Sequence, residues 1–254
     1  RWTKNKYDVI TLEPMSPVQA GTVNLYSLEF YQQALSRLNK NGLMMQWLPL
    51  HLVGPDDAKS ILKTFQQVFP HTSIWNSFLT RIVLLVGSKE EIILDKIRFE
   101  DVMQLPKIRE SAKKIGINSF LDFTDFFLTD AVNVNSFVEN VEVITDDNPL
   151  LEFSQVTLLP PFKWQVDETF LNYLKYRIRH YPKVSGLVSA EERRWKKNFL
   201  IRTAQRLSVF SQRYHGPGEL AFKKKEYLRG ISQIKSYLDK QESKTIKLNG
   251  TKWK

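Results

Sequence analysis

Apolar and polar positions follow two different spacings along the first 90 residues. Val9, Ile10 and Leu12 form a short, nearly continuous apolar run, which is typical of a strand covered on both faces. Residues 27–42 then have apolar side chains at positions 30, 31, 34, 35 and 38, which is helical spacing, and Asn41-Gly42 predicts the end of that helix. Residues 43–52 predict a second buried strand.

The same alternation continues to residue 88. Residues 54–70 predict a helix, because Pro55 suits a first turn, Asp56 and Asp57 favour the positive helix start, and Pro70 ends it. Residues 71–78 and 81–88 predict two antiparallel strands with a short polar link. The resulting order, β-α-β-α-β-β, predicts an α/β fold with a mostly parallel sheet and helices on both faces.

The rest of the chain has a weaker pattern. Residues 90–140 predict small helices and loops, and residues 143–153 predict a strand or a turn. Beyond residue 162 the spacing is helical, with one shared apolar face made by Trp195, Phe199, Leu207 and Phe210, and a second made by Tyr227, Leu228, Ile231, Ile234 and Leu238. The His-Gly-Pro-Gly at 215–218 predicts a hinge, so these two helices are expected to form an antiparallel pair.

Charge divides the chain at about the same place. Residues 1–155 hold 15 Lys and Arg against 19 Asp and Glu, whereas residues 156–254 hold 22 against 8, a net charge of +14. The Pro-Pro break at 160–161 supports a boundary there. We therefore expect an α/β domain in residues 1–155 and a basic α-helical extension in residues 156–254. Nucleic acid is not the expected partner, since no recognised binding motif is present, and Lys223–Lys225 reads as a solvated helix face.

Composition narrows the protein class. The chain has 254 residues, 42% of them hydrophobic, which is enough for a real core. It has no cysteine, which excludes disulfides and thiolate metal sites. No apolar run approaches the ~20 residues of a membrane span, and no apolar signal region opens the sequence, so a cytoplasmic location is expected. His51 and His71 have no second ligand at metal spacing, so no metal site is predicted.

The candidate chemistry lies at the strand ends. Glu13 follows the first strand on a loop stiffened by Pro14 and Pro17, and Gln46 lies near the end of the second strand. Open α/β sheets bind ligands at the carboxyl ends of their strands. If the strands are neighbours, Glu13 and Gln46 face one crevice, where an acid and an amide could bind a cationic amine and accept its proton. Alternatively, Glu13 caps its own loop and Gln46 is a satisfied polar core residue.

Asp146 and Asp147 allow two interpretations. They could be a metal-binding or acid pair, or part of an Asp-Asn-Pro turn. Adjacent residues of a strand point to opposite faces, so the pair does not easily serve one site.

The ordered motifs resemble a known family. The runs YDVITLEPMSP, LYSLEFYQQALSRLNKNGLMMQWLPLHLVGPDDAKSILKTFQQVFP, IVLLVGS and TDDNPLLEF resemble the spermidine synthase-like family of polyamine aminopropyltransferases, over about residues 7–155. The branch is similar to bacterial proteins in which such a domain is fused to a membrane transporter-like half. The resemblance implies the carboxyl-terminal half of a methyltransferase-like Rossmann fold and transfer of an aminopropyl group from decarboxylated S-adenosylmethionine to a polyamine such as putrescine.

The resemblance also implies residue roles. Glu13 matches the family's Asp that helps deprotonate the attacking amine, Ser16 matches a second Asp that helps hold the amine, and Gln46 matches a glutamine at the next strand end. The sequence departs from the family at Glu13 and Ser16, so the amine clamp has one charge fewer.

The cofactor-binding part of the family pattern is missing. No Gly-rich turn leads from a predicted strand into a helix, so residues 1–254 are expected to bind no cofactor and to be inactive alone. Decarboxylated S-adenosylmethionine would be a co-substrate where the missing half is present. The full-length protein would then include a membrane-embedded half, with the present domain at the cytoplasmic face of the membrane. Homo-oligomer formation is a further open alternative. The alternative is a non-catalytic, Rossmann-derived scaffold whose basic helical tail binds an acidic partner.

Overall fold

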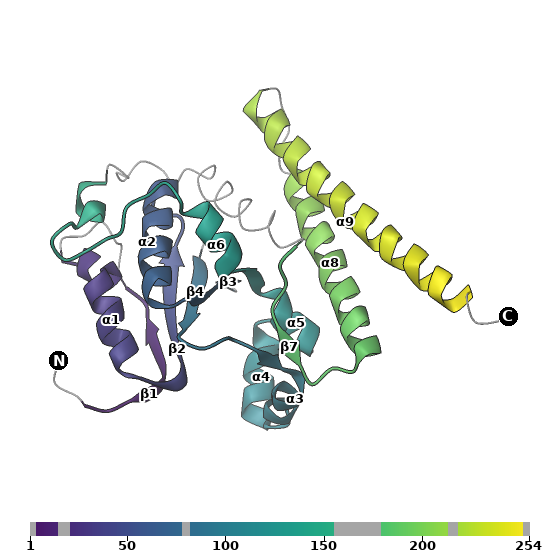
Figure 1. Ribbon diagram of the computed structural model, residues 1–254, viewed down its shortest axis with the longest axis horizontal. Helices are drawn as coiled ribbons and strands as arrows, with labels where there is room; N and C mark the ends of the chain where they lie inside the picture. Colours follow the sequence, from purple (N-terminus) through teal and green to yellow (C-terminus); the bar gives the residue numbers. More distant parts are fainter. Residues whose placement is uncertain (1–3, 15–20, 78–81, 155–178, 213–217, 251–254) are drawn as a thin grey trace. The chain divides into compact units, whose positions relative to one another are not determined.

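The chain divides into two compact units. The computed structural model describes residues 4–14, 21–77, 82–154, 179–212 and 218–250 (Figure 1). One unit comprises residues 1–176 with 180–186, and the other comprises residues 177–179 with 187–254. The boundary expected near residues 155–162 lies outside the described residues, and the described segment 180–186 belongs to the first unit.

A five-stranded mixed sheet forms the centre of the first unit, which is therefore α/β as expected. Its order is β1-β2-β4-β3-β6, with β1 (Tyr7–Leu12), β2 (Leu38–Pro49), β3 (His71–Asn76), β4 (Ile82–Ser88) and β6 (Phe127–Asp130). β1 and β2 are parallel, but the other three neighbouring pairs are antiparallel. The expectation of a mostly parallel sheet is wrong, whereas the predicted β3–β4 hairpin is confirmed. The reason is that the hairpin places β4 between β2 and β3, so that β4 opposes both.

The start of β2 corrects a second prediction. Helix α1 (Leu28–Ser36) ends six residues before Gly42, and Asn41-Gly42 lies inside β2. Asn41 has φ 65°, in the left-handed region, and the β1–β2 register jumps from Leu38 to Leu43 across it. The Asn-Gly pair therefore forms an irregularity in a strand, because the same left-handed backbone that ends helices also permits a bulge.

Helices cover one face of the sheet. Helices α1, α2 (Pro55–Val68) and α6 (Ala131–Phe137) lie over this face in Figure 1, and the short 3-10 helix η1 (Val23–Tyr26) packs against α1 and α2. Alternate residues of the strands point into this core and are fully buried, including Met44, Leu48, Ile74 and Leu85. Helix α2 begins as predicted at Pro55, and the Asp57 carboxylate accepts a hydrogen bond from the Gly54 backbone N–H (3.3 Å).

The opposite face is covered only in part, which limits the expectation of helices on both faces. The first unit also contains three short helices, α3 (Lys96–Met103), α4 (Pro106–Lys114) and α5 (Phe120–Asp125). On this second face of the sheet, Trp75 of β3 packs against Phe123 of α5, with ring centroids 5.6 Å apart. Nearer to β1, Leu43, Met45 and Trp47 are half-buried and line an apolar cavity of about 350 Å³. The sequence did not predict β6, because residues 90–140 were expected to form small helices and loops. It also did not predict two short strands, β5 (Leu94–Asp95) and β7 (Val184–Ser185), which form a separate parallel pair.

The second unit is a helical hairpin. It contains α8 (Ser189–Ser211) and α9 (Glu219–Gly250). The Phe210 and Tyr227 rings stack 5.8 Å apart, and Lys196 lies over the Tyr237 ring, so the helices run antiparallel as predicted. Leu228, expected on the apolar stripe, is instead 48% exposed. The predicted hinge lies in residues 215–218, of which 215–217 are outside the described residues. No helix in the described part of the chain is both long and apolar enough to cross a membrane.

Candidate functional site

Glu13 lies where β1 ends. Leu12 is the last residue of that strand and pairs with Gln46 of β2, so Glu13 is one position beyond the paired region. The Glu13 side chain is exposed, whereas Pro14 is buried and anchors the chain directly after it. Among the described residues, no hydrogen bond or ion pair of the Glu13 carboxylate is found. The carboxylate is thus presented to solvent at the edge of the sheet where β1 and β2, which are parallel, both end.

A turn brings further carboxylates to this edge. Thr145 and Asn148 close the turn through two backbone hydrogen bonds of 3.4 and 3.1 Å. The turn is held against the start of α1, since the Asp146 backbone N–H donates to Glu29 Oε2 (3.0 Å). Asp146 and Asp147 are both exposed on it, so the turn interpretation of this pair holds.

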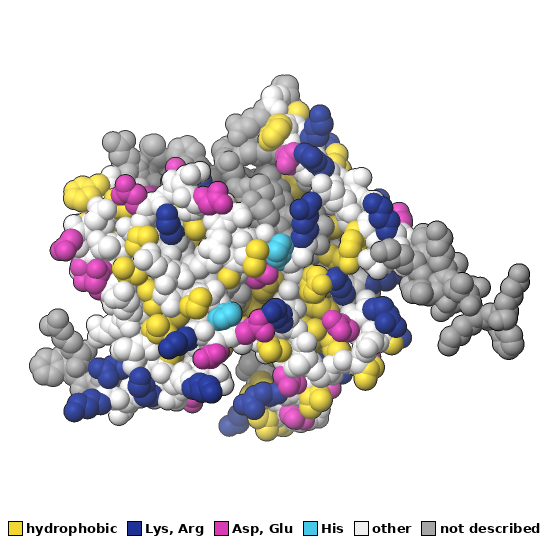
Figure 2. All heavy atoms as spheres, in the orientation of Figure 1, with side chains coloured by type: hydrophobic (Ala, Val, Ile, Leu, Met, Phe, Trp, Pro, Cys, Tyr) yellow, Lys and Arg dark blue, Asp and Glu magenta, His cyan; other side chains and the backbone are white. Residues whose placement is uncertain are grey.

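The following residues extend the same acidic edge. Glu152, in the 3-10 helix η2 (Leu150–Phe153), accepts a hydrogen bond from the Gly21 backbone N–H (2.9 Å). The Ser154 hydroxyl lies 2.5 Å from Oδ2 of Asp57, in the first turn of α2. Figure 2 shows Asp and Glu side chains gathered at this end of the first unit, at the upper left of the view. We call the set Glu13, Glu29, Asp56, Asp57, Asp146, Asp147 and Glu152 the acidic edge.

Gln46 is not on this exposed edge. Its side chain is fully buried, on the helix-covered face beneath Tyr26 and Tyr31. Burial raises the pKa of both tyrosines, and their contacts with Gln46 lower the pKa by a smaller amount. Neither Nε2 nor Oε1 of Gln46 makes a hydrogen bond of good geometry with a described residue, so these contacts are weak. The position favours a polar core residue, although an incompletely satisfied one. The third residue, Ser16, lies outside the described residues.

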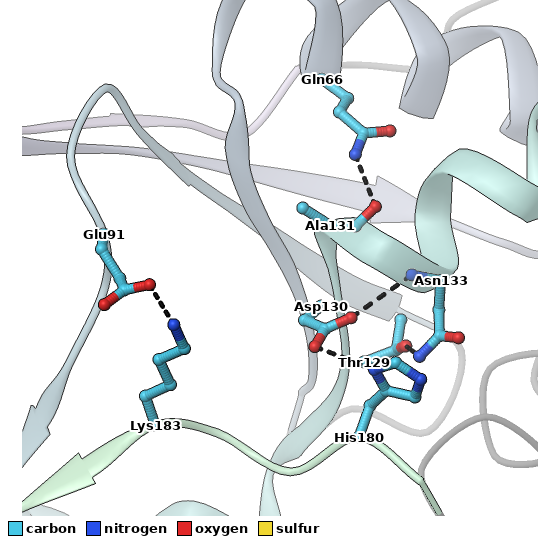
Figure 3. A network of polar contacts seen from close by, with 8 residues as sticks. All are labelled: Gln66, Glu91, Thr129, Asp130, Ala131, Asn133, His180 and Lys183. Carbon is cyan, nitrogen blue, oxygen red and sulfur yellow. Dashed lines mark hydrogen bonds and ion pairs between the residues drawn. The ribbon is translucent and has the colours of Figure 1, made fainter.

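The structure also forms a second polar site that the sequence did not indicate. Nδ1 of His180 lies 3.1 Å from Oδ2 of Asp130 at the end of β6, and Lys183 pairs with Glu91 (Figure 3). Oδ1 of Asp130 also accepts from the Asn133 backbone N–H (3.3 Å) and so caps α6. These pairs join residues 50 and 92 positions apart, so no local pattern could have found them.

The His180–Asp130 contact and the Lys183–Glu91 ion pair hold the segment 180–186 against the rest of the first unit. The Leu94 backbone N–H donates to the Lys183 carbonyl (2.9 Å), and β5 pairs with β7 next to it. The Lys183 ammonium holds the pKa of Glu91 below its ordinary value. A cavity of about 370 Å³ lies beside these groups, but its carboxylates are already paired, which favours a structural role. Among the described residues, no cluster of three His, Asp or Glu side chains suits a metal ion.

The fold and the acidic edge define an α/β protein with an exposed carboxylate at the carboxyl end of a parallel strand pair. No protein-family model matches the chain, and no curated protein sequence matches it.

Proposed function

We propose that this chain contributes the amine site of a spermidine synthase-like transferase, with Glu13 as general base. One observation carries the proposal: Glu13 is exposed at the carboxyl end of β1, beside the parallel strand β2. This is the edge at which open α/β sheets of the Rossmann type bind ligands. The order β1-α1-β2-α2, with each helix returning across the same face, is compatible with the carboxyl-terminal half of such a fold.

The charge of the edge supports an amine substrate. Polyamines are cations at neutral pH, and the acidic edge places several exposed carboxylates around the position where β1 and β2 end. One of them, Asp56, is partly neutralised, because Lys59 Nζ lies 2.8 Å from its Oδ1. A concentration of one sign of charge raises the local concentration of the opposite ion and speeds its capture. The proposed substrate is therefore a polyamine such as putrescine.

The proposed chemistry uses Glu13 for one proton. The amine nitrogen must carry a free lone pair before it attacks the carbon bonded to the sulfonium of decarboxylated S-adenosylmethionine. The new N–C bond forms as the C–S bond breaks, the electron pair goes to sulfur, and the proton lost by the amine passes to the Glu13 carboxylate. The buried Pro14 fixes the chain directly after Glu13, which limits how far the carboxylate can move.

The other implied residues take different places in the proposal. Gln46 lies under the edge, in the core, so its proposed contribution is to the floor of the site rather than to a direct amine contact. Ser16 stays a proposed amine ligand. Decarboxylated S-adenosylmethionine stays the proposed donor, and the Gly-rich turn that would bind it is not among residues 1–254.

The test is aminopropyl transfer by the complete natural protein carrying this domain. Glu13→Gln keeps the shape and removes the base, so turnover should fall by about 10²–10⁴-fold. Glu13→Asp should be milder, because the family's own acid is the shorter one. The matched control is Asp147→Asn, which removes one charge from the same acidic edge and should mainly raise KM by a few-fold.

Melting temperatures separate catalysis from folding. Glu13 is exposed, so all three variants should melt within about 1–2 °C of the wild type, as surface substitutions usually do. If Glu13→Gln and Asp147→Asn lower turnover equally, the edge acts only through its charge and Glu13 is not the base. If Glu13→Gln unfolds the protein, the carboxylate caps its own loop and the proposal is wrong.

A further inference from the structure

The helical hairpin of the second unit contains a groove at its open end. Helices α8 and α9 diverge away from the hairpin turn in Figure 1. A groove of about 600 Å³ lies between the first part of α8 and residues 237–241 of α9. Its apolar floor contains Leu200, which is buried, with Tyr237 and Leu238, which are half-buried. The accessible part of this apolar floor is therefore made by Tyr237 and Leu238.

The rim of this groove is strongly basic. Arg193, Arg194, Lys196 and Lys197 all line it, and Glu192 is the single acidic residue among its lining residues. Arg193, Arg194 and Lys197 are exposed, whereas Lys196 is half-buried with its ammonium 5.8 Å from the centre of the Tyr237 ring. Residues 187–254 of this unit hold 17 Lys and Arg against 6 Asp and Glu, a net charge of +11, so this rim lies within a positive field.

An apolar floor between cationic rims selects among the possible polyanions. A nucleic acid backbone supplies phosphates for the rim but no apolar stripe to cover Tyr237 and Leu238. An amphipathic helix supplies both, because apolar residues at i, i+3, i+4 and i+7 form one stripe and acidic residues can flank it. Packing such a helix against α8 and α9 would bury the accessible surface of Tyr237 and Leu238.

We propose that this groove binds an acidic amphipathic helix of a partner protein. Leucine-type residues of the partner pack on Tyr237 and Leu238, and its Asp and Glu side chains pair with Arg193 and Arg194. The inference is independent of the proposed function, since it uses only residues of the second unit.

The test uses the full chain and labelled synthetic peptides, with binding followed by fluorescence anisotropy. The first peptide has about 18 residues, ~27 Å as a helix, with a leucine stripe flanked by glutamates. The second has lysines in place of those glutamates, and the third has the composition of the first in an order without a stripe. Single-stranded and duplex oligonucleotides serve as competitors. The acidic striped peptide should bind at least about ten-fold more tightly than either control peptide, and more weakly as salt rises.

Paired variants locate the binding site. Arg193→Gln with Arg194→Gln removes two exposed rim charges and should weaken the acidic peptide about 5-fold, since each exposed ion pair contributes little. Lys225→Gln with Lys235→Gln removes two exposed charges of α9 outside the groove and should leave affinity within about two-fold. Leu238→Asn should weaken binding about ten-fold through the floor.

Three results would overturn the proposal. The first is no binding of the acidic striped peptide, or equal binding of the peptide without a stripe. The second is equal weakening by the groove pair and the control pair, which would show only diffuse charge attraction. The third is displacement of the peptide by oligonucleotides that bind more tightly and are insensitive to Leu238→Asn, which would assign the surface to nucleic acid. Far-UV circular dichroism of each variant verifies that both helices are retained.

Discussion

Gly87 is the position where the sheet and its covering helix approach most closely. It lies in β4 between Met44 of β2 and Thr72 of β3, and a side chain at this position would point toward α2. An added Cβ would lie 2.5 Å from Cε1 of Phe65 and 2.6 Å from Cβ of Phe69. Real Cβ atoms do not approach other atoms this closely, so Gly87→Ala must displace the helix or the rings.

The surroundings leave little room for that displacement. Phe65 and Phe69 are fully buried, their ring centroids are 4.8 Å apart, and Phe65 meets Tyr31 edge-on at 5.1 Å. Overpacking of this kind costs about 1–3 kcal/mol, which the lower entropy of an unfolded chain with Ala offsets by about 0.4–1 kcal/mol. We expect the free energy of unfolding to fall by about 1–2 kcal/mol and the melting temperature to fall by about 2–8 °C. The assay is urea and thermal unfolding followed by circular dichroism and tryptophan fluorescence.

A double-mutant cycle tests the cause. Phe65→Leu alone should cost about 1–2 kcal/mol, because it leaves a cavity. In the double variant the new methyl group no longer meets the Phe65 ring, whereas its close contact with Cβ of Phe69 remains, so the combined cost should be about 0.5 kcal/mol or more below the sum. Gly21→Ala is the control: Gly21 has φ 76° and no atom within 4 Å of its added Cβ, so its cost should simply add to that of Phe65→Leu. Additive costs for Gly87→Ala and Phe65→Leu would refute the reasoning, as would an unchanged Gly87→Ala protein.

Three further outcomes are expected. Gln46→Met should leave the free energy of unfolding unchanged or raise it by about 1 kcal/mol, because the buried amide lacks well-formed hydrogen bonds. If urea unfolding shows that this free energy falls by more than about 2 kcal/mol, the contacts of Gln46 with Tyr31 are stabilising. The pKa of Glu91 is lowered in the folded chain, so its pair with Lys183 stabilises the fold at pH values above the ordinary Glu pKa, and this stabilisation is lost as pH falls through the lowered pKa. In Lys183→Met, NMR titration should show that the Glu91 pKa rises toward its ordinary value, and an unmoved pKa would contradict the pairing. A chain without residues 187–254 should elute from heparin at lower salt than the full chain, and unchanged elution would place the polyanion affinity in the first unit.

The sequence by itself determined the elements whose signals are local. The start of α2 was readable from Pro55 and Asp57, because a helix start is settled within one turn. The β3–β4 hairpin and the α8–α9 pair were readable too, since each joins neighbours in the chain through a short link. Local spacing and end chemistry act over a few residues, and these elements depend on little else.

Asn41-Gly42 shows where local chemistry becomes ambiguous. A left-handed residue can end a helix or form an irregularity in a strand, and the residue types are the same in both cases. The choice was made by β1, whose pairing with β2 resumes at Leu43 and keeps Met44 on the buried face.

Only the tertiary structure decided which segments meet. The insertion of β4 between β2 and β3 made the sheet mixed, and no signal within any one strand specifies its neighbours. No local signal specifies the direction of the Gln46 side chain either. It lies on the face of β2 that points into the core, whereas Glu13 is exposed at the end of β1. The Asp130–His180 pair joins residues far apart in the chain. Pairings of this kind depend on how the whole core packs, because side chains are buried by partners that the fold brings together and not by their neighbours in sequence.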